Sequence, residues 1–347
     1  MAQLLMGILL HAIGASCASL CYLPQKKATN WSWQTYWLAQ AVVCWLLLPF
    51  IGAWLTIPHL GTVLSEAPKS AMINAFLLGL AYGVGGTAFG MAIRYVGYSL
   101  TYAIAVGISC VLGTLLPPIV SGKLMDILHS NGSGLIITGI TAGAIGIALC
   151  GVAGRYKEID LEKKALNKQT FQFTKGLLLC LLAGFLSALY GFSIAQGEPI
   201  AEVAGKYGAG DLKGNVIYIF SNTGAFVTTL IYCIYLHVKY KTFGEYKNAR
   251  GGNLNVYYLM AIITGVLWYS QFFFYGLGHV RLGEKYDFTS WAIHMIMLVL
   301  FSTLTGLLLR EWAACNRKTI RILGLALTVL VAAVIVLTYG NYIGGLN

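Results

Sequence analysis

Residues 286–309, YDFTSWAIHMIMLVLFSTLTGLLL, combine two features that rarely occur together. From Asp287 onward the stretch is apolar and long enough to cross a bilayer, because roughly 30 Å of hydrocarbon needs about 20 residues at 1.5 Å each. The same run contains Asp287, Trp291 and His294. An ionisable side chain inside the membrane costs at least about 2.5 kcal/mol, so these groups are candidates for function.

Apolar runs of this length recur along the whole chain of 347 residues. Hydrophobic residues make up 58% of the sequence and charged residues only 10%, with a mean hydropathy of +0.72. Soluble domains carry about 25% charged residues, which excludes an ordinary soluble globule. We therefore expect an all-α polytopic membrane protein with about ten transmembrane helices. The expected spans are residues 4–22, 37–57, 71–93, 99–121, 134–152, 176–196, 214–236, 256–278, 287–309 and 320–340.

The eight cysteines and the start of the chain indicate neither a metal site nor a cleaved signal. The cysteines lie almost entirely inside the apolar runs and form no CxxC pair, so packing is the expected role. The first run has no basic segment before it and is interpreted as the first span. We expect no cofactor and no metal.

The net charge of +11 is distributed unevenly between the loops. Loops that follow odd-numbered spans contain 17 of the 23 lysines and arginines, and loops that follow even-numbered spans contain 6. Basic residues accumulate on the cytoplasmic side of membrane proteins. The asymmetry therefore predicts cytoplasmic odd loops and periplasmic termini, and it indicates membrane topology rather than nucleic-acid binding.

A basic central loop, residues 153–175, separates two halves of five spans each, residues 1–152 and 176–347. Residues 79 and 265 are both glycine, and an offset of 186 also aligns the aromatic residues Tyr82 and Trp268. Because five is odd, the second half would enter the membrane from the opposite side. This pattern predicts two inverted five-helix repeats, as in many secondary transporters. Chance similarity between glycine-rich helices is the alternative.

Candidate site residues lie at helical spacing in the ninth span. Asp287, Trp291 and His294 follow the i, i+4, i+7 pattern and so share one helical face. Counting crossings places His11 at a similar depth in the same half of the membrane as His294, and His279 faces that side as well. The alternative is that Asp287 caps the helix and His294 is a hydrogen-bonded packing residue.

The eighth span carries a second polar and aromatic face. Trp268, Gln271 and Tyr275 fall at i, i+3 and i+7. Amides and carboxylates hydrogen-bond sugar hydroxyls, and aromatic rings cover the C–H face of a sugar, so the two faces together favour a sugar substrate. The segment NWSWQTYW, residues 30–37, is instead interpreted as an aromatic belt at the membrane surface.

The sequence gives little support for an enzyme or a channel. The chain has no P-loop, HExxH, aspartate-rich motif or nucleophile elbow, so we do not expect an enzyme. The sequence also lacks the ring of like charges that would indicate a channel. A transporter or exporter of another small solute in the same fold remains the main alternative to sugar uptake.

Two segments, HAIGASCASLCYLPQKK (residues 11–27) and WYSQFFFYGLGHVRLGEKYDFTSWAIHM (residues 268–295), resemble the bacterial L-rhamnose–proton symporters of the drug/metabolite transporter superfamily. The resemblance extends over essentially the whole chain. It implies ten spans, an internal duplication, and uptake of L-rhamnose or a related 6-deoxyhexose with protons across the inner membrane. The matching positions are His11, Trp268, Gln271, His279, Tyr286, Asp287, Trp291 and His294.

The resemblance and the residues together lead to specific roles. We expect Asp287 to be the leading proton carrier and His294 the second. The sugar-binding residues are expected to be His11, Trp268, Gln271, Tyr275, His279, Tyr286 and Trp291. Glu198 stands where the family suggests a basic residue, so no role is assigned to it. Many members of the superfamily are thought to keep their termini inside, whereas the charge count of this chain places them outside.

Overall fold

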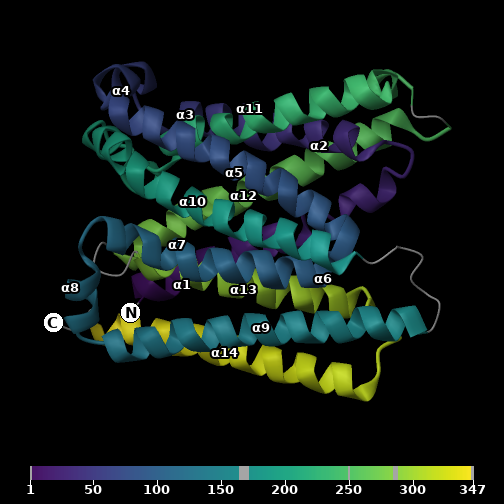
Figure 1. Ribbon diagram of the computed structural model, residues 1–347. Helices are drawn as coiled ribbons and strands as arrows, with labels where there is room; N and C mark the ends of the chain where they lie inside the picture. The colour runs from purple at the N-terminus through teal and green to yellow at the C-terminus, as the bar shows by residue number, and fades with distance from the viewer. Residues whose placement is uncertain (1, 164–171, 249–250, 284–287, 345–347) are drawn as a thin grey trace. The chain divides into compact units, whose positions relative to one another are not determined.

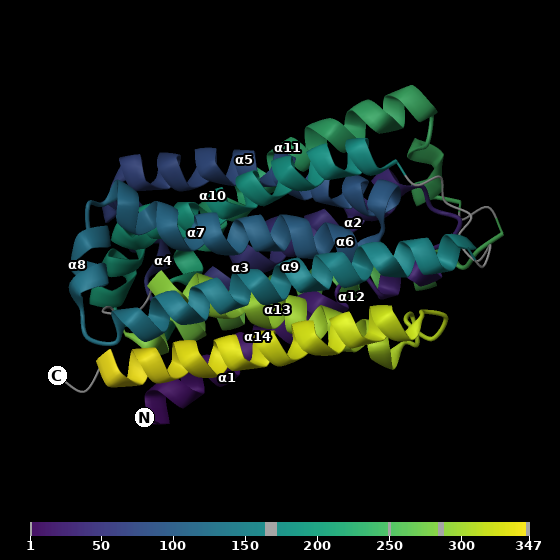
Figure 2. The ribbon, with the colours of Figure 1, turned by 60° about the horizontal axis from the view of Figure 1, so that its bottom comes forward.

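The computed structural model describes residues 2–163, 172–248, 251–283 and 288–344, and the regular elements in these ranges are all helical (Figures 1 and 2). The main helices are α1 (Ala2–Leu20), α2 (Trp33–Ala41), α3 (Leu48–Thr56), α4 (Leu60–Glu66), α5 (Lys69–Val96), α6 (Tyr98–Thr101), α7 (Gly107–Val120), α8 (Leu124–His129), α9 (Ser133–Lys163), α10 (Phe173–Lys206), α11 (Asn215–Tyr240), α12 (Leu254–Leu282), α13 (Phe288–Leu308) and α14 (Arg317–Gly344). Short 3₁₀ segments are η1 (Pro24–Lys27), η4 (Gly210–Leu212) and η5 (Phe243–Tyr246), and η2 (Val42–Leu47) and η3 (Tyr102–Val106) are π-helical.

Ten stretches of the described chain are long and apolar enough to cross a membrane, which confirms the expected number of spans. They run Ala2–Lys27, Trp33–Thr56, Lys69–Val96, Tyr102–Val120, Ser133–Lys163, Thr174–Lys206, Gly210–Tyr240, Leu254–Leu282, Thr289–Leu308 and Arg317–Gly344. The chain is therefore an all-helical, multi-pass membrane protein.

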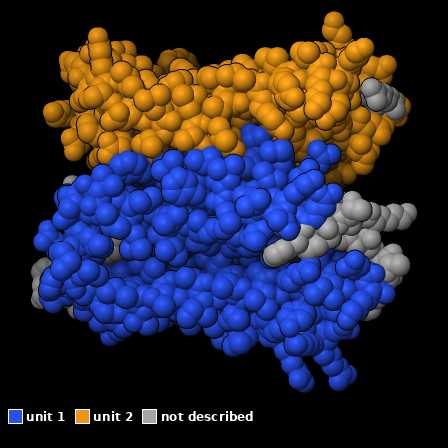
Figure 3. Space-filling view, viewed as in Figure 1, with its two compact units in different colours: residues 1–19, 85–192, 277–347 blue, residues 20–84, 193–276 orange. Residues whose placement is uncertain are grey.

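The chain forms two compact units, coloured separately in Figure 3. Unit 1 comprises residues 1–19, 85–192 and 277–347, and unit 2 comprises residues 20–84 and 193–276. Each unit contains segments from both sides of the basic central loop. The proposed five-helix halves are therefore intertwined rather than separate bodies along the chain.

In unit 1, α9 and α14 run side by side along their length (Figures 1 and 2). Glycines on α9 make this approach possible: a Cβ at Gly139 would lie 2.6 Å from Leu337, and one at Gly146 would lie 2.8 Å from Leu330. Small residues at helical spacing let membrane helices pack closely where lipid supplies no hydrophobic drive for association. The N-terminal end of α1, the C-terminal end of α14 and α8 lie at one end of unit 1 (Figure 1).

The opposite end of unit 1 is held by a carboxylate on α9. Asp160 accepts hydrogen bonds from the backbone N–H and side-chain amide of Asn316, and from the Thr319 hydroxyl at 2.7 Å. These groups form the start of α14, where backbone N–H groups lack partners within the helix. Asp160 therefore caps α14 from another span.

In unit 2, α5 and α11 come into backbone contact. A Cβ at Gly79 would collide with the Ser221 backbone, and one at Gly224 would collide with the Phe76 carbonyl. Ser193 on α10 donates to the Ala75 carbonyl at 2.8 Å and shares a hydrogen bond with the Ser221 hydroxyl at 2.7 Å. The glycines thus let α5 and α11 pack closely, and Ser193 joins α10 to both helices.

Candidate functional site

A cluster of two imidazoles and one hydroxyl lies inside unit 1, formed by His11 on α1 and by Ser290 and His294 on α13. The ring centroids of His11 and His294 are 5.7 Å apart with an interplanar angle of 67°. The Ser290 hydroxyl and His11 Nε2 share a hydrogen bond of 3.1 Å. His11 is fully buried and His294 is 2% exposed. We call these three residues the histidine cluster.

Close backbone packing places His11 in this cluster. A Cβ at Gly7 would lie 3.1 Å from the Gly278 carbonyl oxygen, and one at Gly278 would lie 3.0 Å from His11 Nε2. The last turns of α12 therefore contact α1 directly. His279 follows Gly278 in the chain and is half-buried. The ring contact of His11 and His294 agrees with the expectation that they lie at a similar depth in the membrane.

Trp291 lies on the same helix as His294 but contacts different neighbours. Its indole Nε1 donates to the Ser109 carbonyl at 2.9 Å. A Cβ at Gly191 would lie 3.2 Å from its ring, and Gly113 leaves room on the indole nitrogen side. Trp291 is thus packed between α7 and α10, with its N–H already donated to the backbone. A sugar-binding role for Trp291 stays a prediction.

The N-terminal part of α13 is anchored to α14. The side-chain amide of Asn341 donates to the Thr289 hydroxyl at 2.9 Å, and both residues are buried. This bond lies one residue before Ser290 and so helps to hold the histidine cluster. Tyr286 and Asp287 lie outside the described residues, and their expected roles stay predictions.

Unit 2 contains a dense group of aromatic rings, which we call the tryptophan cluster: Tyr22, Trp37, Trp45, Tyr82 and Trp268. The ring centroid of Trp268 lies 5.2 Å from Tyr22, 5.6 Å from Trp37 and 5.5 Å from Trp45, in each case edge to face. Tyr82 packs against Trp45 at 6.1 Å. Edge-to-face pairs at these separations are favourable for aromatic rings.

The π-helical segment η2 explains how Trp37 and Trp45 face the same neighbour. Eight residues along an ideal α-helix, at 3.6 residues per turn, would turn Trp45 roughly 80° away from Trp37. A π-helix takes more residues per turn, so the angle gained per residue falls. Because Val42–Leu47 is π-helical, both indoles contact Trp268. π-bulges frequently occur at functional sites.

Three hydrogen-bond donors in α2 and η2 are buried without a partner among the described residues: Trp37 Nε1, Gln40 Nε2 and Trp45 Nε1. Trp37 is 1% exposed, and Gln40 and Trp45 are fully buried. The other end of the Gln40 amide, Oε1, accepts a hydrogen bond from the Cys44 thiol at 3.4 Å. Most buried polar groups in proteins are hydrogen-bonded, so three such donors within nine residues need an explanation.

A second carboxylate cap orients the helix that carries these donors. One oxygen of Glu245, in η5, accepts hydrogen bonds from the Ser32 backbone N–H at 2.8 Å, the Ser32 hydroxyl at 2.7 Å and the Thr35 hydroxyl at 2.6 Å. The Glu245 carbonyl accepts from the Trp31 indole at 2.9 Å. Ser32 precedes the first residue of α2, so Glu245 completes the N-terminus of α2 from a distant loop.

The remaining expected residues of unit 2 lie on α12 with Trp268. Gln271 is 8% exposed and Tyr275 is 5% exposed. Between them, the Phe272 carbonyl accepts a hydrogen bond from the Tyr218 hydroxyl at 2.7 Å, which joins α11 to this part of α12. The predicted stripe of Trp268, Gln271 and Tyr275 is therefore buried.

The interpretation of residues 30–37 as a surface aromatic belt is wrong for its buried members. Trp31, Tyr36 and Trp37 are 6%, 2% and 1% exposed. Only packing of α2 against other helices decides that these rings point inward. The sequence nevertheless contained an indication of a buried polar and aromatic face, because Trp37 and Gln40 repeat the spacing of Trp268 and Gln271.

Within the described residues, no group of three or more histidine, cysteine, aspartate or glutamate side chains is arranged to hold a metal ion. The two clusters consist of uncharged aromatic rings, hydroxyls and the two imidazoles, and the amides of Gln40 and Gln271 lie on the same helices as the tryptophan cluster. Such groups can bind a neutral polyhydroxyl compound, and the imidazoles can in addition exchange a proton.

Comparison with known proteins agrees with this chemistry. The model of the L-rhamnose-proton symport protein family matches residues 1–342. The L-rhamnose-proton symporter of Cronobacter sakazakii is 34% identical over 333 residues, which cover 94% of this chain and 95% of the relative. The symporter of Mannheimia succiniciproducens is 33% identical over 335 residues, covering 95% and 96%. That of Escherichia coli O1:K1 is 32% identical over 333 residues, covering 94% and 95%.

Proposed function

The chain belongs to the L-rhamnose-proton symport protein family, and we propose that it takes up L-rhamnose, or a closely related 6-deoxyhexose, together with protons across the bacterial inner membrane. The family match over residues 1–342 carries this proposal. Ten membrane-spanning helices agree with it. Symport is transport rather than catalysis, so the chain is a transporter and not an enzyme.

The sugar-binding part of the proposal has its best support in unit 2. Trp268, Gln271 and Tyr275 are buried on one stretch of α12, and Trp268 contacts three further aromatic rings. Aromatic faces can cover the C–H side of the sugar, and the Gln271 amide can bond its hydroxyls. His11, His279, Tyr286 and Trp291 complete the proposed set of sugar ligands. Of these, the Trp291 indole N–H is donated to Ser109.

The proton-coupling part has its support in unit 1. An imidazole gains and loses a proton near physiological pH. Two imidazoles with centroids 5.7 Å apart disfavour a second positive charge, so the histidine cluster would hold at most one imidazolium at a time. His294 is therefore a proposed proton carrier, and Asp287, seven residues earlier in the chain, is the leading one.

We also propose that the two halves of the chain are inverted repeats, because matched positions have matched neighbours. Gly79 on α5 abuts α11, the seventh span. Its counterpart Gly265 on α12 abuts Gln40 and Val43 in the second span. The pairing of spans three and seven is thus repeated as eight and two, which is what a five-plus-five repeat requires.

The ends of the spans give the same correspondence within unit 1. Gly7 in the first span lies against Leu282 at the end of the eighth. Gly176 in the sixth span lies against Val96 at the end of the third. Val96 and Leu282 differ by 186 positions, the same offset that aligns Gly79 with Gly265. Inverted repeats let a transporter expose one site alternately to the two sides of the membrane.

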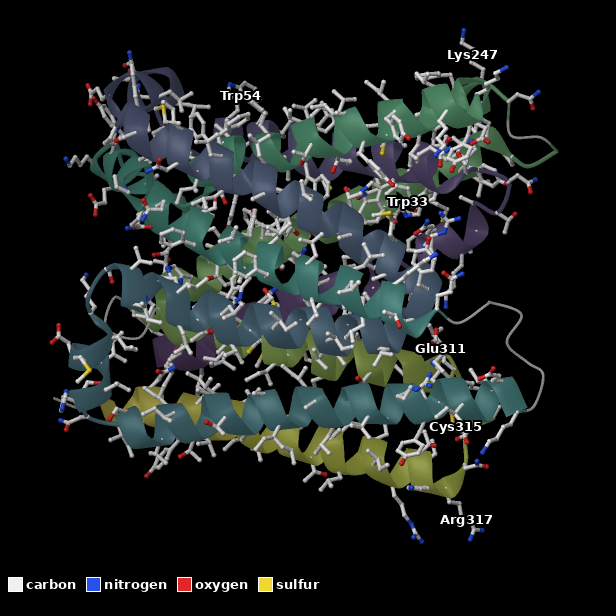
Figure 4. All side chains as sticks on the ribbon, viewed as in Figure 1. Trp33, Trp54, Lys247, Glu311, Cys315 and Arg317 are labelled. Carbon is white, nitrogen blue, oxygen red and sulfur yellow. The ribbon has the colours of Figure 1, made fainter. Side chains whose placement is uncertain are left out.

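The proposed orientation places both termini in the periplasm, since odd-numbered loops contain 17 of the 23 basic residues. In Figure 4, Lys247 lies at the same end of unit 2 as Trp33, and Trp54 lies at the other end. In unit 1, Arg317 lies at the same end as Glu311 and Cys315 (Figure 4). The structure places Arg155, expected in the central loop, near the C-terminal end of α9. An alkaline phosphatase fusion after Arg155 should be inactive. Activity of this fusion would contradict the proposal and place both termini in the cytoplasm.

The decisive experiment for the function is L-rhamnose uptake into proteoliposomes that contain the purified chain. An imposed inward proton gradient should drive accumulation of the labelled sugar, and collapse of the gradient with a protonophore should abolish it. A chain that moves a different solute would show no L-rhamnose counterflow. Product formation without any gradient would indicate an enzyme instead.

A further inference from the structure

We propose that Trp37, Gln40 and Trp45 form a sugar subsite in unit 2, in which their three N–H groups donate hydrogen bonds to sugar oxygens and the Trp268 ring covers the apolar side of the sugar. The proposal rests on the proposed function as a sugar transporter and assigns residues that the family resemblance did not indicate. These residues all lie between residues 37 and 45 except Trp268, which contacts both indoles.

The first argument is the burial of donors that lack partners. Trp37 Nε1, Gln40 Nε2 and Trp45 Nε1 have no hydrogen-bond partner within the described chain, and their residues are at most 1% exposed. A buried donor without a partner is costly, whereas a ligand oxygen would remove that cost. Binding sites hold such donors in place for a ligand, because a limited number of well-placed polar groups fixes its orientation.

The second argument is the chemistry of the three donors. Indole N–H groups only donate, and the Gln40 oxygen already accepts from Cys44. The subsite therefore offers donors and needs acceptors, which sugar hydroxyl and ring oxygens supply. The subsite residues are neutral, which favours an uncharged polyol over a phosphate or a carboxylate. Apolar ring surface beside the donors fits the C–H groups and the methyl group of a 6-deoxyhexose.

The third argument is the way in which the helix is held. Glu245 fixes the start of α2 through Ser32 and Thr35, two residues before Trp37. Farther along, Gly265 lets α12 approach so closely that a Cβ there would lie 3.0 Å from the Gln40 carbonyl. Preorganised groups on rigid elements bind with a smaller loss of entropy. The hydrogen bonds to Glu245 thus fix the rotation of the helix that carries the subsite, and the contact at Gly265 fixes its distance from α12.

The subsite is closed in this structure, because the rings touch each other and leave the donors inaccessible. A sugar can reach the donors only when the Trp268 edge moves away from Trp37 and Trp45. The sugar then replaces an aromatic edge with its own C–H groups. Binding should consequently alter the environment of three indoles, which changes intrinsic tryptophan fluorescence.

The test measures the L-rhamnose Kd of the purified full-length chain by isothermal titration and by tryptophan fluorescence. Trp37→Phe and Trp45→Phe keep an aromatic ring, Gln40→Met keeps a side chain of similar length, and each variant removes one donor group. Each should raise the Kd about 5- to 150-fold, because a sugar oxygen is left unpaired in a buried site. The variants are made singly, so any one that keeps the wild-type melting temperature decides the question.

Two matched controls separate a subsite from a general effect of removing an indole. Trp312→Phe removes another buried indole whose Nε1 has no partner among the described residues, but it lies in unit 1 beside Lys157. Trp54→Phe removes an indole that is 73% exposed (Figure 4). Both controls should leave the Kd within about twofold of the wild type.

The outcomes distinguish this proposal from the proposed function. Wild-type L-rhamnose counterflow together with unchanged Kd values in well-folded Trp37, Gln40 and Trp45 variants overturns the subsite and leaves the transporter function intact. Absence of L-rhamnose binding and counterflow in the wild type overturns the function itself. Raised Kd values in these variants, with both controls unchanged, support the subsite.

Discussion

The histidine cluster of unit 1 and the tryptophan cluster of unit 2 differ in the chemistry of their polar groups. In the histidine cluster, His11 Nε2 shares a hydrogen bond with the Ser290 hydroxyl and the His11 ring packs against His294, so the cluster holds two imidazoles, which can exchange a proton. In the tryptophan cluster, the indole N–H groups of Trp37 and Trp45, which can only donate, are buried without a partner in the described chain. The proposed proton exchange lies in unit 1, and the proposed sugar contacts with the best support lie in unit 2.

The largest expected effect tests the proton side of this comparison. Asp287→Asn should abolish gradient-driven accumulation of L-rhamnose and preserve sugar counterflow, because the neutral amide resembles the protonated acid but cannot release a proton. Both activities are measured in the same proteoliposomes. If His294→Gln shows this pattern and Asp287→Asn still accumulates sugar, the roles of the two residues are reversed.

A smaller effect is expected on the sugar side, from Gln271→Leu. This change keeps the approximate side-chain volume and removes the amide, so sugar hydroxyls lose a buried partner. Such a loss costs about 1–3 kcal/mol, which corresponds to a roughly 5- to 150-fold weaker affinity for L-rhamnose. Titration of the purified variant measures it. Unchanged affinity in a correctly inserted variant would remove Gln271 from the site.

The two carboxylate caps sharpen the comparison further. Glu245→Gln weakens the hydrogen bonds to Ser32 and Thr35, and Asp160→Asn weakens those to Asn316 and Thr319. Hydrogen bonds to charged groups contribute about 1.5–3 kcal/mol, so both variants should melt at a lower temperature. Only Glu245→Gln should also raise the L-rhamnose Kd, by roughly tenfold, because α2 carries Trp37 and Gln40. Equal Kd changes in both variants would mean that the cap of α2 acts only through stability.

The smallest expected effect concerns Ser290. Ser290→Ala removes the hydrogen bond to His11 Nε2, whose net contribution is about 1 kcal/mol. Proton-driven uptake should fall by a few-fold, and counterflow should stay near the wild-type rate, if the histidine cluster serves coupling. An equal fall in both rates would assign the cluster to sugar binding instead. Thr338→Val is the matched control, since its hydroxyl bonds only the Val334 carbonyl within α14 among the contacts described.

Some features of this protein follow from its residues alone. Ten spans are predictable because the thickness of hydrocarbon requires about 20 apolar residues per crossing, whatever the packing. The contact between His11 and His294 is predictable in part, since the number of crossings between them places both in the same half of the membrane. The stripe formed by Trp268, Gln271 and Tyr275 is also visible, because helical periodicity depends only on sequence spacing.

Other features depend on how the helices pack. The composition of residues 30–37 is the same for a belt at the membrane surface and for a buried face, so the burial of Trp37 could not be predicted from it. The place of Trp45 beside Trp37 depends on the π-helical turn at Val42–Leu47, a change of register that has no fixed sequence signature. Glu245 caps α2 from more than 200 residues away, and the Trp291 indole bonds Ser109, 182 positions earlier. Hydrogen bonds between distant segments form only where the folded helices bring donor and acceptor within about 3 Å, and local sequence does not encode that distance.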